Sequence, residues 1–211
     1  MAGISRRAWL ATLGLAPVAG GLAAWAENEK KKSQERIRKT HEDPRDMVRE
    51  RHFPNTELIT HNGRRVLFYD DLIKDKKVIL NFMYAQCKGI CIPVTTNLVR
   101  VQKLLKERGR LDIFFYSITL KPEDDTPEVL RHYAEMHGVG PGWLFLTGKP
   151  EDIEMLRRRQ RFVDVDPAVD ADKSSHIGMI RYGNEPMVRW AACPGLADPG
   201  HIVRTLLWDL G

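Results

Sequence analysis

Residues 77–91 read KVILNFMYAQCKGIC, an apolar run that ends in a pair of cysteines. The run from Lys77 to Tyr84 is short and almost continuously apolar, which is typical of a central strand that is covered on both faces. From Pro93 to Arg108, apolar residues recur at helical spacing. The sequence therefore predicts that Cys87 and Cys91 lie at a strand-to-helix junction.

Strand and helix patterns alternate on both sides of this junction. We expect a hairpin at 57–69 turning at Asn62-Gly63, strands at 111–120 and 143–147, helices at 126–138 and 150–159, an acidic loop at 163–175, a hairpin at 176–192 turning at Gly183-Asn184, and a last helix from Asp198. Alternating β and α units predict an α/β domain with a largely parallel central sheet flanked by helices. The two hairpins add antiparallel strands, so the sheet is mixed.

Composition limits the class of protein. The 211 residues are 43% hydrophobic and 29% charged, which is enough apolar material for an ordinary core. The three cysteines are too few for a small domain held together by disulfides. The net charge of +5 is modest and spread along the chain, so we expect no nucleic-acid partner.

The first 26 residues resemble a bacterial twin-arginine export signal. They contain no acidic residue, and Arg6-Arg7 precedes a weakly hydrophobic stretch that ends in Ala24-Trp25-Ala26. Small residues at Ala24 and Ala26 suit signal peptidase, whereas the length of the stretch also suits an uncleaved anchor. We therefore expect a protein that is exported to the periplasm or anchored to the outer face of the bacterial inner membrane.

Residues 27–52 are almost all polar and form an expected charged linker, so the folded domain is expected to span 53–211. An exported domain meets an oxidising compartment, where a cysteine pair is oxidised unless it is reduced or occupied by metal. A C-x-x-x-C step puts two cysteines one helical turn apart, and a helix N-terminus favours thiolate. The spacing leaves open a redox pair, a metal site or two inert thiols.

Among metals, copper suits this pair better than zinc. Structural zinc needs four ligands, and no second cysteine pair is present. Cu(I) accepts two thiolates, and a histidine would complete a three-coordinate site that also holds Cu(II). His176 follows the acidic loop and opens an expected strand, where it could reach a neighbouring loop. Spacing alone does not distinguish a ligand at this position from an ordinary histidine.

The domain resembles the Sco/SenC family across roughly residues 54–210. The resemblance rests on NFMYAQC before the second cysteine, on SITLKPEDDTPEVLRHYAEMHG, on WLFLTG and on SSHIGMIRYG, in the family's order. It implies a thioredoxin-like fold and copper held by Cys87, Cys91 and His176. It also implies delivery to the CuA centre of cytochrome c oxidase, with a copper donor, a copper-accepting oxidase subunit and a thiol reductant as partners.

The chain departs from the family pattern near the site. Lys88 and Ile92 stand where the family commonly has proline after each cysteine, and Ile177 follows His176 where the family often has serine. These changes remove no ligand, but they leave the target and the affinity open. Cys193 remains outside the motif, and we interpret it as a small buried residue, or else as a thiol that pairs with a partner.

Two functions are compatible with these residues. The first is a copper metallochaperone, which is a binding and delivery protein rather than an enzyme. The second is a periplasmic thiol–disulfide oxidoreductase that reduces target cysteines through the redox pair Cys87 and Cys91. Thiol exchange needs only thiolates, so a role for His176 would favour copper.

Overall fold

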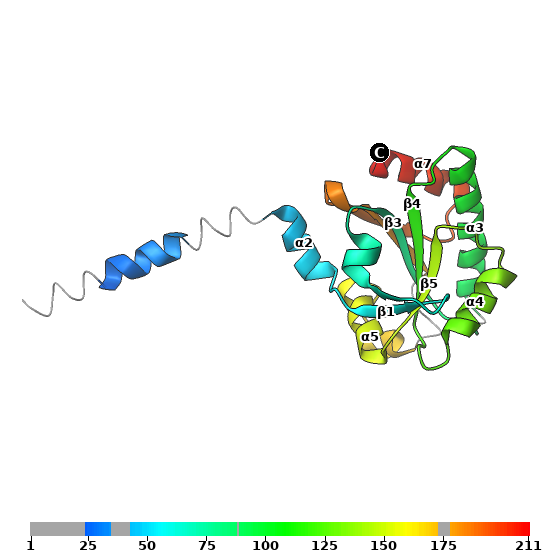
Figure 1. The fold of residues 1–211 in the computed structure, drawn as a ribbon, viewed down its shortest axis with the longest axis horizontal. Coiled ribbons are helices and arrows are strands. Elements are labelled where there is room, and N and C mark those ends of the chain that lie inside the picture. The colour runs from blue at the N-terminus through cyan, green and yellow to red at the C-terminus, as the bar shows by residue number, and fades with distance from the viewer. Residues whose placement is uncertain (1–23, 35–42, 88, 173–177) are drawn as a thin grey trace, which may run out of the picture. The chain divides into compact units, whose positions relative to one another are not determined.

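The computed structural model describes residues 24–34, 43–87, 89–172 and 178–211 (Figure 1). The chain divides into two compact units, Met1–Asp43 and Pro44–Gly211. In the first unit, residues 24–34 are helical. Within the described ranges, no helix combines the length and apolar character that crossing a bilayer requires. The expected export motif and His176 lie outside the described residues.

The Pro44–Gly211 unit is built on a seven-stranded mixed sheet with strand order β2-β1-β5-β4-β3-β6-β7. Its strands are β1 (Glu57–Thr60), β2 (Arg65–Leu67), β3 (Lys77–Met83), β4 (Ile113–Thr119), β5 (Trp143–Thr147), β6 (Met179–Asn184) and β7 (Arg189–Pro194). Its helical elements are α2 (Pro44–His52), η1 (Phe68–Ile73), α3 (Cys91–Glu107), α4 (Pro127–Met136), α5 (Pro150–Arg159), α6 (Pro167–Ala171), η3 (Glu185–Met187) and α7 (Pro199–Leu210). The predicted α/β class, the mixed sheet and the N-terminal hairpin are confirmed.

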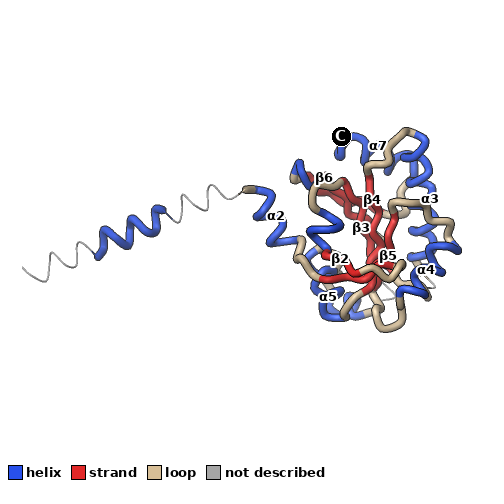
Figure 2. The backbone as a smooth tube through the Cα atoms, in the orientation of Figure 1, coloured by secondary structure: helices blue, strands red, loops and turns tan. Residues whose placement is uncertain are grey.

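Strand β3 occupies the centre of the sheet, as its apolar sequence predicts. It pairs in parallel with β4 and antiparallel with β6, while β4 pairs in parallel with β5. Every residue of β3 after Lys77 is buried. Figure 2 shows the strands in the middle of this unit, and Figure 1 shows α3 and α4 on one side of the sheet and α5 on the other. The chain therefore leaves β3 from inside the core and reaches α3 directly.

The compact unit begins at Pro44, earlier than the expected boundary at Phe53. Helix α2 has no buried residue, but Arg45 pairs with Glu185, whose carboxylate is buried. The hydroxyl of Tyr69 and the backbone N–H of Asp75 also donate to Glu185, each at 2.8 Å. The polar sequence of α2 concealed this contact because it depends on charge and not on an apolar stripe.

The C-terminal hairpin turns later than the sequence suggested. Strand β6 continues through Asn184, and η3 makes the turn, so the expected turn at Gly183-Asn184 is wrong. Gly183 serves packing instead, because a Cβ atom there would lie 2.2 Å from the Trp190 ring. A further difference is α6, which forms inside the expected acidic loop.

Candidate metal centre

The two cysteines lie where β3 passes into α3. Cys87 lies in the loop after β3, and Cys91 is the first residue of α3. The spacing had suggested that both cysteines lie on one helical turn, but Cys87 precedes the helix and only Cys91 belongs to it. Both side chains are 2% exposed. We refer to residues 84–91 as the cysteine loop.

Hydrogen bonds make the two thiols unequal. The thiol of Cys91 and the hydroxyl of Tyr84 hydrogen-bond to Cys87, and the N–H of Gly89 lies 3.4 Å from its sulfur. Burial by itself raises the pKa of Cys87, but these donors outweigh burial and lower it. Burial and the neighbouring Cys87 both raise the pKa of Cys91. Cys87 is therefore the first of the pair to become a thiolate.

The two thiols carry no disulfide, and a third cysteine lies apart from them. Cys193 is half-buried on β7, opposite Ile180 of β6. Burial, with Asp209 nearby, raises the pKa of Cys193 to about 11. The structure thus keeps this thiol protonated, which agrees with its interpretation as a small buried residue.

A buried carboxyl supports the cysteine loop from behind. Asp125 is 1% exposed; it accepts hydrogen bonds from the N–H of Ala85 at 3.1 Å and from the hydroxyl of Thr119 at 2.5 Å. Burial raises the pKa of Asp125. Sequence reasoning missed this residue, although it directly precedes Thr126, which caps α4 through the N–H of Val129. A carboxyl between a strand end and a helix cap was the available signal.

The segment that follows His176 returns to the cysteine loop. Gly178 packs so closely against Ile90 that a Cβ atom on it would lie 2.2 Å from the Ile90 side chain. The carbonyl of Gly178 accepts a hydrogen bond from Gly195 at 2.8 Å, which fixes the start of β6 there. The first described residue after His176 is therefore in contact with the residue that precedes Cys91.

The described histidines do not join the cysteines. Among the residues that the structure describes, no group of three or more His, Cys, Asp and Glu side chains is arranged to hold a metal. His61 hydrogen-bonds to the backbone of β5, His52 hydrogen-bonds to the end of α5, and the ring of His137 packs at a tilt against Tyr133. Lys88 and His176 themselves lie outside the described residues.

Comparison with known proteins places the chain in a family. The SCO1/SenC family model matches residues 47–179, which is more than half of the chain. An SCO2-like protein of Rickettsia prowazekii is 30% identical over 98 residues, which cover 46% of this chain and 45% of the relative. The match therefore spans less than half of that relative's length.

Solved structures share the fold at low sequence identity. They include a SCO1/SenC family lipoprotein from Bacillus anthracis, at 22% identity with a TM-score of 0.62, covering 74% of this chain and 93% of that one. Arabidopsis thaliana ScoI, solved with copper bound, is 22% identical with a TM-score of 0.58, covering 72% and 93%. BsSco, described as a member of the Sco family of cytochrome c oxidase assembly proteins, is 21% identical with a TM-score of 0.60, covering 72% and 90%. With its thioredoxin-like fold and the family match over 47–179, this chain belongs to the SCO1/SenC family.

Proposed function

We propose that this protein holds one copper ion through Cys87, Cys91 and His176 and delivers it to the CuA centre of cytochrome c oxidase or of a related copper enzyme. The observation that carries this proposal is the adjacent, unequal thiol pair at the start of α3. A thiolate is the soft ligand that Cu(I) prefers, and Cys87 is the thiol most easily ionised. Metal binding would then take the remaining proton from Cys91.

The position of Gly178 supports His176 as the third ligand. Gly178 touches Ile90, and it follows His176 by two residues. Two residues of extended chain reach about 7 Å, so the backbone at His176 can extend no further than that from Gly178. On this proposal, the short connection from Gly178 allows the imidazole of His176 to complete the copper site.

The family supports copper as cargo and an oxidase as its destination. A relative is solved with copper bound, and another is described as an oxidase assembly protein. Delivery needs ligand exchange, in which thiolates of the accepting subunit replace Cys87 and Cys91 one at a time. The expected partners are that subunit, a copper donor and a thiol reductant. An exported protein, soluble or anchored outside the inner membrane, would meet them.

The inequality of the thiols also favours a second function. If the protein is a thiol–disulfide oxidoreductase, the thiolate of Cys87 would attack a target disulfide and form a mixed disulfide. The sulfur of Cys91 would then attack Cys87 and release the reduced target. The pair would lose two electrons and two protons and become a disulfide, which a thiol reductant would restore. His176 would contribute nothing to this exchange.

Copper binding by the reduced full-length chain separates the two functions. We expect one copper per chain and a thiolate-to-Cu(II) charge-transfer band for the wild type. His176→Ala should lose the band, and His201→Ala, which changes an exposed histidine on α7, should keep it. Equal copper binding by both variants would contradict the proposed ligand set. The reduction potential of the cysteine pair would then be the property to measure.

A further inference from the structure

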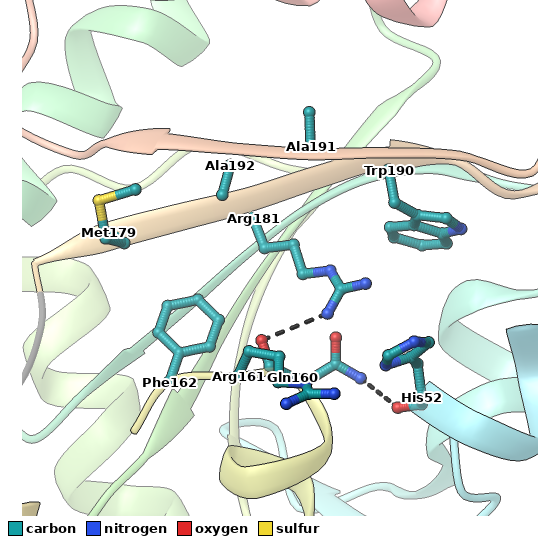
Figure 3. A pocket seen from close by; sticks show the side chains of 9 residues that line it. All are labelled: His52, Gln160, Arg161, Phe162, Met179, Arg181, Trp190, Ala191 and Ala192. Carbon is teal, nitrogen blue, oxygen red and sulfur yellow. Dashed lines mark hydrogen bonds between the residues drawn. The ribbon is translucent and has the colours of Figure 1, made fainter. Parts of the chain in front are cut away.

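A pocket of about 360 Å³ opens on the sheet between the β6–β7 hairpin and the ends of α2 and α5 (Figure 3). It is separate from the cysteine loop, none of whose residues lines it. We call it the arginine pocket, and its walls are His52, Gln160, Arg161, Phe162, Met179, Arg181, Trp190, Ala191 and Ala192. Its volume falls in the range of roughly 300–1,000 Å³ that small-molecule sites occupy.

The pocket contains cations without matching acids. Arg181 lies over the rings of Phe53 and Trp190, 5.6 Å from each centroid, and its guanidinium donates to the carbonyl of Gln160 at 3.3 Å. Among the residues that the structure describes, no carboxylate forms an ion pair with Arg181 or Arg161. Burial, reinforced by Arg161, lowers the pKa of Arg181. Arg161 is exposed and Arg181 is partly buried, so a negative group bound in the pocket would meet two guanidinium groups that no described carboxylate occupies.

Arg161 reaches the pocket through an unfavourable backbone. It follows α5 with a φ of 64°, in the left-handed conformation that this helix end usually gives to glycine. In Figure 3 its guanidinium lies below Gln160, on the side toward His52. The N–H of Phe162 donates a hydrogen bond to the carbonyl of Arg157 at 3.0 Å. The same bond would close the helix end if glycine stood at position 161. Arginine at this position therefore adds charge and nothing to the cap.

Gln160 leaves one buried hydrogen-bond group unused. Its side chain is 2% exposed, and its amide nitrogen donates to the carbonyl of His52 at 2.5 Å. Its amide oxygen Oε1 is buried without a hydrogen-bond partner. Figure 3 shows this oxygen pointing into the pocket, toward Arg181 and Trp190. An unpaired buried acceptor is costly, so the pocket also lacks a donor.

The remaining wall is apolar. Phe162, Met179 and Trp190 line it, and the Trp190 ring packs on Phe53 with 4.3 Å between centroids. An anion alone would leave this surface and the Gln160 oxygen unused. The three missing partners are thus a negative group, an N–H donor and a small apolar group.

We propose that the arginine pocket binds an N-acylated amino-acid unit that ends in a free carboxylate. The carboxylate lies between Arg181 and Arg161, the amide N–H donates to Oε1 of Gln160, and the side chain packs against Trp190 and Phe162. A free N-acyl amino acid and the C-terminus of a polypeptide carry this same chemistry. The pocket shares no residue with the copper ligands, so this proposal does not depend on copper binding.

Titration of the full-length, metal-free and reduced chain tests the pocket. The probes are N-acetyl-leucine, N-acetyl-leucine amide and acetate, followed by calorimetry and by the NMR signal of the Trp190 indole N–H. We expect N-acetyl-leucine to bind and to shift that signal. The amide, which lacks the charge, and acetate, which lacks the N–H and the side chain, should each bind at least about tenfold more weakly. An N-acetylated tetrapeptide ending in leucine should bind more tightly than N-acetyl-leucine if the source is a polypeptide terminus, and equally if it is a small molecule.

Matched arginine variants locate the site. Arg161→Gln should weaken N-acetyl-leucine binding at least about tenfold, whereas Arg158→Gln, on the exposed side of α5, should leave it unchanged. Arg161→Gly gives the same test with a residue suited to the backbone, in case the glutamine variant folds poorly. Equal binding of the acid and its amide would overturn the proposal. So would equal losses in the two glutamine variants, or no binding of any probe.

Discussion

The cysteine loop and the arginine pocket lie on the same sheet, and their side chains favour ligands of opposite charge. In the cysteine loop, Cys87 is surrounded by hydrogen-bond donors that favour a negative sulfur. In the arginine pocket, neither Arg181 nor Arg161 forms an ion pair with a carboxylate of the described residues. On the two proposals above, a soft cation would complete the first site and an anion the second. We therefore propose one place in the domain for a metal and another for a negatively charged organic group.

Arg157 shows what a structural arginine looks like in the same region. It is buried on α5, pairs with Asp170 and Glu154, and donates to the carbonyl of Phe162 at 2.8 Å. The hydrogen bonds that Arg157 donates to Asp170 and Glu154 raise the pKa of Arg157, whereas burial lowers that of Arg181. Arg157 is buried and has its acids, whereas Arg181 is partly buried and has no described acid partner, as expected if it meets the negatively charged ligand that we propose.

The largest expected effect tests this contrast between arginines. Arg157→Ala removes a buried guanidinium that pairs with Asp170 and Glu154 and donates to the carbonyl of Phe162, and it should lower the free energy of unfolding by about 3–5 kcal/mol. Arg181→Met keeps an apolar stem beside Trp190, removes an unpaired cation and should change it by less than about 1 kcal/mol. Urea denaturation of both variants measures the difference. Similar losses in the two variants would mean that Arg181 is structural.

A smaller effect is expected behind the cysteine loop. Asp125→Ala leaves the N–H of Ala85 and the hydroxyl of Thr119 buried without an acceptor, which should cost about 2–3 kcal/mol. Asp125→Asn keeps an acceptor and should cost about 1 kcal/mol. Urea denaturation at constant pH measures the free energy of unfolding of both variants. If Asp125→Asn lost more stability than Asp125→Ala, the carboxyl would not be needed as a hydrogen-bond acceptor.

The stability difference between the wild type and Asp125→Asn should depend on pH. Burial raises the folded-state pKa of Asp125 above its unfolded value of about 3.9, so folding favours the protonated carboxyl. This contribution is complete below the unfolded pKa and is lost as pH rises through the folded pKa. The stability of the wild type relative to Asp125→Asn should therefore fall as pH rises from about 4.

Substitutions of Cys91 test how far its thiol lowers the pKa of Cys87. In a Cys193→Ala background, Cys91→Ala removes a donor to the Cys87 thiolate, an interaction worth roughly 1.5–3 kcal/mol, and should raise the pKa of Cys87. Cys91→Ser keeps a donor and should raise it less. Ultraviolet absorbance of the thiolate against pH measures both. Because folding lowers this pKa, the stability it contributes is present above the unfolded pKa of about 8.5 and is lost as pH falls through the folded pKa.

The smallest effect concerns the backbone at Arg161. Arg161 has a left-handed backbone, which costs an ordinary residue about 1–2 kcal/mol and costs glycine nothing. Glycine loses more backbone entropy on folding, which cancels about 0.5–1 kcal/mol of that gain. Arg161→Gly should therefore raise the free energy of unfolding by about 0.5–1 kcal/mol. A loss of stability in denaturant titration would mean that the arginine side chain contributes to folding and not only to the pocket.

The cysteine loop was predictable because its parts are contiguous. Fifteen residues contain the buried strand, both cysteines and the helix start, and each follows a local rule. The support from Asp125 was missed because this residue comes from the loop between β4 and α4, distant in sequence from the cysteines. The arginine pocket could not be predicted, since its walls come from residues 52, 160–162 and 179–192, which only the sheet brings together. The hairpin turn was misplaced because the packing of Trp190 on Gly183 overrode the usual role of Gly-Asn.

X-ray absorption at the copper edge tests most directly whether copper binds in the cysteine loop. The copper-loaded full-length chain should show two sulfur ligands and one imidazole nitrogen. Cys193→Ala should give the same spectrum, and Cys87→Ser should lose a sulfur. A spectrum of the wild type dominated by nitrogen and oxygen ligands, or one that Cys193→Ala alters, would contradict the account.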